Sequence, residues 1–152
     1  MQNIFFKTIG ATLTAALLAV NLNAAPDSNR WAQQVNYKLA AATAYLDIES
    51  TYQPSHETAL GNLRQNTYEE RTYNLQAGVD YYFIGECDQD CKDLDIKLYD
   101  ENYNLIDQDV KPDNSPVVHV RPKWSGQFHM RVIMSQCNDN PCYWGVGAYD
   151  PR

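Results

Sequence analysis

The chain has 152 residues, of which 44% are hydrophobic and 20% are charged, and its formal net charge is -7. This balance is typical of one globular domain and excludes a disordered chain. The excess of acidic residues argues against nucleic acid and anionic membranes as partners, because both select basic surfaces. Solubility, a cation site and a basic partner are the remaining explanations of the charge.

The N-terminus has the pattern of a secretory signal peptide. Lys7 supplies the positive charge, an apolar stretch runs from Ile9 to Val20, and small residues suited to cleavage follow at Ala24. The stretch is too short to span a membrane comfortably. We therefore expect residues 1–24 to be removed, leaving a periplasmic or secreted mature chain without a membrane span.

An amphipathic helix is predicted next, with Asp27 or Ser28 as its capping residue. Its apolar stripe consists of Trp31, Val35, Leu39, Ala42 and Leu46. Packing of this stripe against the chain's own domain is the preferred interpretation, and docking onto another chain is the alternative. Residues 25–66 are interpreted as this helix and a connector, with a short helical turn between Thr58 and Arg64.

From Thr67 onward the apolar residues alternate with polar ones, which predicts strands. The predicted strands cover residues 68–75, 79–85, 93–100, 105–110, 117–121, 127–136 and 143–149. Short strands separated by polar turns are typical of an antiparallel sandwich. We predict a mainly β fold, in which one amphipathic N-terminal helix precedes an antiparallel, jelly-roll-like β-sandwich over residues 67–152.

Four cysteines form two close pairs, Cys87 with Cys91 and Cys137 with Cys142. In an exported chain, an even number of closely spaced cysteines favours disulfides, and three connectivities are possible. The connectivity within each pair is preferred. A zinc site that uses all four thiolates is the alternative, although structural zinc favours shorter spacings.

The turns also predict an acidic end of the sandwich. If every connection reverses the chain, both cysteine loops lie at the same end as the loop 111–115. Six aspartates would gather there: Asp88, Asp90, Asp93, Asp109, Asp113 and Asp139. Calcium takes six to eight oxygen ligands of this kind, so these residues are candidate calcium ligands. Aspartate is also a common turn former, which is the alternative explanation.

Two histidines are a second candidate metal site. A tight turn over residues 122–126 would pair Arg121 with Gln127 and would place His119 directly opposite His129. Two imidazoles on one sheet face could share a transition metal, but a third ligand is not evident. A surface pair without metal is the alternative. The sequence has no GxSxG, HExxH or phosphate-binding glycine motif.

Three segments together resemble bacterial pre-peptidase C-terminal domains. They are LQAGVDYY at residues 75–82, DLDIKLYD at 93–100 and SGQFHMRV at 125–132. The resemblance covers roughly residues 67–149, and the two cysteine loops are similar to those of a cysteine-bearing subgroup. It implies a small, secreted, jelly-roll-like sandwich without catalytic activity, of a family in which some members bind calcium or insoluble polymers. Because a helix and connector stand here where a peptidase would, we expect a free-standing accessory role.

Two functional hypotheses follow from the sequence. The first is a secreted, non-catalytic binding module that recognises a protein or an extracellular polymer and is stabilised by calcium. The second is a small metal-dependent hydrolase that uses the acidic end or the histidine pair.

Overall fold

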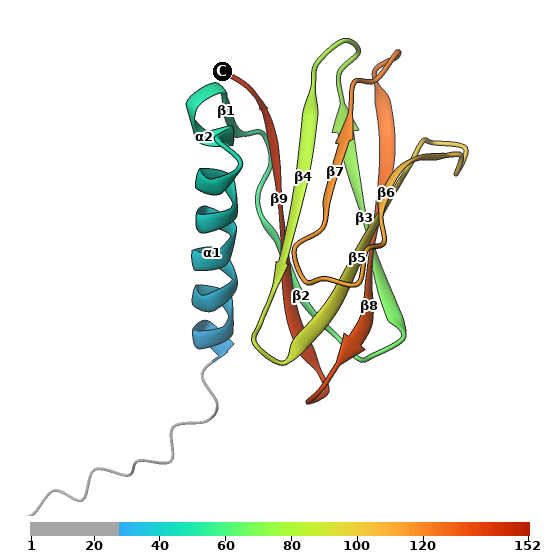
Figure 1. Cartoon of the computed structure of the whole chain (residues 1–152). Coiled ribbons are helices and arrows are strands. Elements are labelled where there is room, and N and C mark those ends of the chain that lie inside the picture. The colour runs from blue at the N-terminus through green and yellow to red at the C-terminus, as the bar shows by residue number, and fades with distance from the viewer. Residues whose placement is uncertain (1–27) are drawn as a thin grey trace, which may run out of the picture.

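The computed structural model describes residues 28–152, so the predicted signal peptide and the candidate cap Asp27 lie outside the described residues. Two helices come first, α1 (Ser28–Tyr45) and α2 (Ile48–Thr51), as Figure 1 shows. Nine strands follow within this range: β1 (Tyr52–Pro54), β2 (Ala59–Leu63), β3 (Thr67–Leu75), β4 (Tyr81–Cys87), β5 (Cys91–Tyr99), β6 (Leu105–Asp109), β7 (Val117–Val120), β8 (Gly126–Cys137) and β9 (Cys142–Pro151).

The strands form two antiparallel sheets that face each other. One sheet has the order β1-β9-β4-β7, with β2 also paired to β9, and the other has the order β3-β8-β5-β6. Alternate side chains of both sheets fill the space between them, among them Phe83, Leu94, Phe128 and Trp144. The predicted β-sandwich with a preceding helix is confirmed.

The connector differs from its prediction. Residues 58–64 form no helical turn, because Ala59–Leu63 pairs with β9 as strand β2. Gly61 leaves room for the side chain of its partner on β9: a Cβ at Gly61 would lie 2.8 Å from Cζ2 of Trp144, too close for the indole ring to stay where it is. Tertiary pairing thus overrides the helix propensity of a short segment with alanine and leucine. The sheets therefore begin at Tyr52, before the predicted domain boundary at residue 67.

Helix α1 covers the outer face of the sheet that contains β9 and β4 (Figure 1). Val35 and Leu39 are buried there, over the small residue Gly145. Trp31 stacks on Tyr143 with ring centroids 5.5 Å apart. The predicted stripe therefore packs on its own domain, but it ends before Leu46, which lies beyond the helix and is exposed.

The two sheets approach each other along the edges of β6 and β7. The backbone N–H of His119 donates to Asp107 Oδ2 at 2.8 Å, and that of Val117 donates to Asp109 Oδ2 at 3.1 Å. These carboxylates occupy donor groups that an edge strand would otherwise present to solvent. Two aspartates of β6 thus protect the edge of β7.

Candidate functional site

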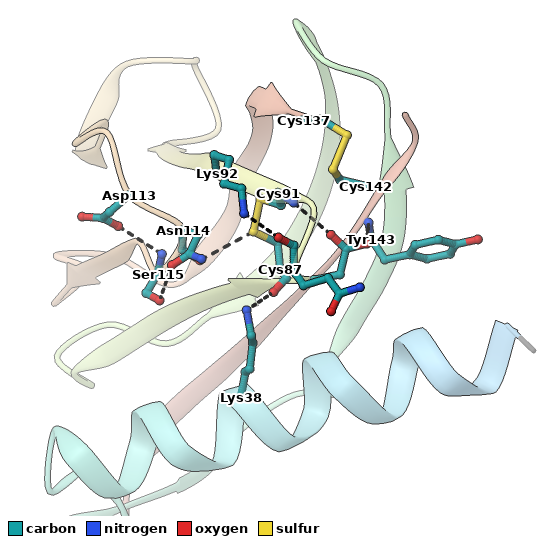
Figure 2. Close-up of a disulfide and its surroundings, with 12 residues drawn as sticks. Lys38, Cys87, Cys91, Lys92, Asp113, Asn114, Ser115, Cys137, Cys142 and Tyr143 are labelled. Carbon is teal, nitrogen blue, oxygen red and sulfur yellow. Dashed lines mark hydrogen bonds between the residues drawn. A yellow bond between two sulfur atoms is a disulfide. The ribbon is translucent and has the colours of Figure 1, made fainter. Parts of the chain in front are cut away.

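Both disulfides are formed in the connectivity that the sequence favours. Sγ of Cys87 is bonded to Sγ of Cys91, and Cys137 is bonded to Cys142. Cys91 and Cys137 are Cα partners in the β5–β8 ladder, so the two loops lie side by side (Figure 2). Such disulfides are typical of proteins outside the cytoplasm. Neither helix in residues 28–152 is long and apolar enough to cross a membrane.

Asp88 has a structural role in the first cysteine loop. Its side chain is buried, and its carboxylate accepts the N–H of Cys91 at 3.1 Å and that of Tyr143 at 2.8 Å. These two bonds connect the β4–β5 turn to the start of β9. A carboxylate whose two oxygens accept backbone N–H groups stabilises the turn. This is the role expected of Asp88 if the aspartates are turn formers and not calcium ligands.

Several of the remaining candidate calcium ligands accept hydrogen bonds from the backbone. Asp109 accepts from Val117, Asp113 accepts the N–H of Ser115 at 3.0 Å, and the backbone carbonyl of Asp90 accepts from Asn138. Asp139 is exposed in the second cysteine loop, and Asp93 lies on the outer face of β5. Among residues 28–152, no three His, Cys, Asp or Glu side chains are placed to hold a metal. Calcium binding stays a prediction.

The predicted histidine pair is wrong. The chain crosses from one sheet to the other between β7 and β8, so the two strands do not pair. His119 lies opposite Tyr82 of β4 and contacts Asp80, whereas His129 lies opposite Thr72 of β3. Neighbouring strands usually form a hairpin, but a sandwich also needs connections that change sheets.

The outer face of the other sheet carries a network of aromatic and charged side chains instead. The ring of Tyr103 stacks on His129 with centroids 4.6 Å apart and planes 3° apart. The Tyr103 hydroxyl donates to Glu70 Oε1 at 2.9 Å, although half of its side chain is exposed. Tyr103 thus covers the middle of the sheet from a turn between β5 and β6.

Arg131 lies at the centre of the same network. Its guanidinium lies 4.4 Å from the ring centroid of Tyr68 and 5.2 Å from that of Tyr99, within the range of cation–π attraction. Its Nη2 also donates to Glu70 Oε2 at 3.1 Å. We refer to Tyr68, Glu70, Tyr99, Tyr103, His129 and Arg131 as the tyrosine–arginine face.

Burial alone would raise the pKa of the Glu70 carboxyl, but the hydrogen bonds from Tyr103 and Arg131 outweigh it, and the pKa is lowered. Glu70 therefore remains an ionised acceptor that holds both side chains. The same hydrogen bonds limit the rotamers that these exposed groups can adopt.

The turn at residues 100–104 explains how Tyr103 reaches this position. Tyr103 has a φ of 60°, a left-handed conformation that is uncommon for a large aromatic residue. The carboxylate of Asp100 stabilises it by accepting the N–H groups of Asn102 and Asn104, each at 2.9 Å, and the side-chain amide of Asn104. Strained residues of this kind are concentrated at functional sites.

Two acidic groups lie on the same sheet face, closer to the cysteine loops. Asp93 Oδ1 and Asp95 Oδ1 are buried and have no hydrogen-bond partner, while Asp95 Oδ2 accepts from Ser135 Oγ. Burial raises the pKa of the Asp93 carboxyl, and the charges of Asp95 and Asp113 raise it further. An approaching cationic group would satisfy these oxygens.

Sequence reasoning missed the tyrosine–arginine face. Alternation could assign Tyr68 and Glu70 to one side of β3 and Tyr99 to the polar side of β5, but it does not give the register between strands. The register places Glu70 opposite Arg131, and Tyr99 opposite His129. Tyrosines in strands most often pack in a core or on a sheet, so the eleven tyrosines of the sequence did not by themselves indicate a binding site.

No protein-family model matches the chain, and no curated protein matches it. Among solved structures, it is similar to the crystal structure of Aeromonas hydrophila PliG, a periplasmic lysozyme inhibitor of g-type lysozyme. The TM-score is 0.44 with 9% sequence identity, over 63% of this chain and 85% of that chain. A likeness at this level carries no argument about function, and the resemblance to pre-peptidase C-terminal domains stays a prediction.

Proposed function

We propose that the chain is a secreted, non-catalytic module that binds a basic protein through its tyrosine–arginine face. The observation that carries the proposal is the position of Arg131 between the rings of Tyr68 and Tyr99, next to the Tyr103–His129 stack. The disulfides and the expected signal peptide agree with a secreted or periplasmic location.

The composition of the face supports protein binding. Tyrosine and arginine are enriched among the residues that contribute most to protein–protein affinity. Tyr68 and Tyr103 each expose more than half of their side chain, at 58% and 53%. Their cation–π contact, ring stack and hydrogen bond hold them before a partner arrives, which lowers the entropy lost on binding.

Charge supports a basic partner. The whole chain carries a formal net charge of -7, and the tyrosine–arginine face shares its sheet with the unpartnered oxygens of Asp93 and Asp95. Opposite charges accelerate encounter and make it sensitive to salt. A polymer remains the alternative partner. The hydrolase hypothesis loses one of its two sites, because His119 and His129 lie on different sheets.

A capture experiment tests the proposal. The immobilised mature chain is exposed to an extracytoplasmic extract of its source, and retained proteins are identified and then titrated as purified species. Purified g-type lysozyme serves as a defined additional probe, although the similarity to PliG does not predict the partner. We expect Tyr103→Ala and Arg131→Ala each to weaken binding of the retained protein about tenfold or more. Binding should also weaken with added salt.

Tyr37→Ala is the matched control, because Tyr37 is exposed on α1, on the opposite side of the molecule. It should leave the affinity unchanged. A partner that binds both face variants as well as the wild type, or that responds to Tyr37→Ala instead, would contradict the proposed surface. Retention on an insoluble polysaccharide, with no protein bound, would favour the polymer alternative.

A further inference from the structure

A pocket of about 310 Å³ lies between α1 and the outer face of the β4–β7 pair, on the opposite sheet from the tyrosine–arginine face. Its apolar wall includes Ala42, Ile84 and Val117, and its polar groups are Glu86 and Ser115. Tyr45 and Leu46 also line it and are exposed, at 90% and 43%. The pocket therefore combines a carboxylate with apolar walls and apolar side chains that are accessible to solvent.

Glu86 points toward the helix side of its sheet. It is the Cα partner of Gly145, where an added Cβ would meet Val35 and Leu39 of α1. Its side chain is buried, with 6% exposure. A carboxylate in such a place loses hydration and gains stability from any partner that restores hydrogen bonds and charge.

The charges around Glu86 leave it incompletely neutralised. Burial raises the pKa of its carboxyl, Ser115 and Lys38 lower it, and Asp113 raises it. The ion pairs of the described residues include none to Glu86. The two acids and one lysine around the pocket therefore carry a net charge of -1 when all are ionised.

Lys38 is held by another contact. Figure 2 shows its side chain extending from α1 to the first cysteine loop, where Nζ donates to the carbonyl oxygen of Cys87 at 2.7 Å. This bond fixes the ammonium at the loop. The Ser115 hydroxyl donates to Asn114 Oδ1 at 3.3 Å, and it also lies near enough to the Glu86 carboxyl to lower its pKa.

We propose that this pocket binds a small alkylammonium compound, with the ammonium on Glu86 and Ser115 and the apolar part against Ala42, Val117 and the exposed Tyr45. Charge-assisted hydrogen bonds to a desolvated carboxylate are among the stronger polar contacts in proteins. The volume lies at the lower end of known ligand sites, which run from about 300 to 1,000 Å³, so one ring or a short chain fits.

Titration calorimetry with three probes of similar shape tests the charge preference without any variant. Phenethylammonium should bind about tenfold or more tightly than 2-phenylethanol, because only the cation pairs with the carboxylate. The anion 3-phenylpropanoate should not bind. Equal affinity for the cation and the alcohol, or no binding of the cation at millimolar concentration, would overturn the proposal.

Variants then locate the site. Glu86→Gln keeps the shape but removes the charge, and it should reduce phenethylammonium affinity about tenfold. Lys38→Met should increase that affinity, because it removes a nearby positive charge that repels the ligand's ammonium. Glu57→Gln is the matched control, since Glu57 is exposed and outside this pocket, and it should change nothing. Unchanged affinity in folded Glu86→Gln protein would overturn the assignment.

The alkylammonium group could belong to a free amine or to a lysine side chain of a protein. Nα-acetyl-lysine methylamide, titrated beside phenethylammonium, distinguishes the two sources. Tighter binding of phenethylammonium supports a free amphiphilic amine, and tighter binding of the lysine derivative supports a protein segment. Binding of neither probe would overturn the proposal, while the protein-binding face on the other sheet would be unaffected.

Discussion

Tyr103 lies flat on His129, with 4.6 Å between the ring centroids, although one residue comes from a turn and the other from the interior of β8. The contact forms because the turn after β5 folds back over its own sheet. Hydrogen bonds from Asn102 and Asn104 to the Asp100 carboxylate hold that turn in place. The partly exposed ring is therefore fixed by the backbone beneath it, which is the property that a binding surface needs.

The variant Tyr103→Phe distinguishes the contribution of the hydroxyl from that of the aromatic ring. Phenylalanine keeps the stack on His129 but removes the donor to Glu70 Oε1. Because that bond lowers the pKa of the Glu70 carboxyl, the pKa should rise in the variant. Titration of the Glu70 carboxyl carbon by NMR measures this directly. The free energy of unfolding should fall only slightly, since the bond is partly exposed to solvent. An unchanged Glu70 pKa would contradict the hydrogen bond.

Acid should weaken the turn that carries Tyr103. The side-chain amide of Asn104 is the main cause of the lowered pKa of Asp100, and backbone N–H groups of Asn104 and Asn102 add to it. Because the folded-state pKa lies below the unfolded value of about 3.9, the ionised carboxylate stabilises the fold at higher pH. That contribution is lost as the pH falls through the folded-state pKa.

Melting temperatures measured against pH test this effect. Asp100→Asn should melt below the wild type at neutral pH, and the difference should shrink in acid below about pH 4. Asp139→Asn, in an exposed loop, provides the control and should follow the wild type at each pH. A difference between Asp100→Asn and the wild type that is independent of pH would show that the Asp100 charge does not hold the turn.

Asp88→Asn should destabilise the fold whether or not calcium is present. The wild-type carboxylate accepts two backbone N–H groups from the loop and from β9. The amide retains a single acceptor oxygen, so one buried donor loses its partner at a cost of about 1–3 kcal/mol. Denaturant unfolding with calcium and with chelator checks this, with Asp90→Asn as the neighbouring control. If calcium stabilised the wild type and both substitutions abolished the effect, the two aspartates would be calcium ligands.

Local patterns predicted those parts of the fold that depend on neighbouring residues. The strict alternation of Leu94, Ile96 and Leu98 identified β5, because a half-buried strand needs that period. The stripe at Val35 and Leu39 identified α1 for the equivalent helical reason. The two cysteines of each disulfide are only four or five residues apart, so their pairing could also be predicted from the local sequence.

Such local patterns do not predict which distant strands pair, or in which register. Strand β2 is five residues long and contains Gly61, and its pairing depends on Trp144, far along the chain. His119 and His129 flank a short turn, yet their strands belong to different sheets. The tyrosine–arginine face requires β3, β8, β5 and the 100–104 turn to be aligned together. Its residues could therefore be recognised only after the sheets were in place.

The contact between α1 and β9 gives the last prediction. Gly145 lies directly beneath the helix, and a Cβ at this position would lie 2.5 Å from Cγ1 of Val35 and 2.8 Å from Cδ2 of Leu60. Val35 is buried and cannot turn into solvent. Gly145→Ala should therefore push α1 from the sheet and cost about 1–3 kcal/mol, the range for overpacking. Denaturant unfolding measures the loss of stability, and faster amide hydrogen exchange in α1 than in β8 would locate it.

Gly78→Ala is the matched control for the same chemical change. An added Cβ at Gly78 meets no atom within 4 Å, and the only cost is its φ of +77°. That strain should be about 1 kcal/mol and should leave exchange in α1 unchanged. If Gly145→Ala lost no more stability than Gly78→Ala and exchange in α1 stayed slow, the helix would not rest on Gly145.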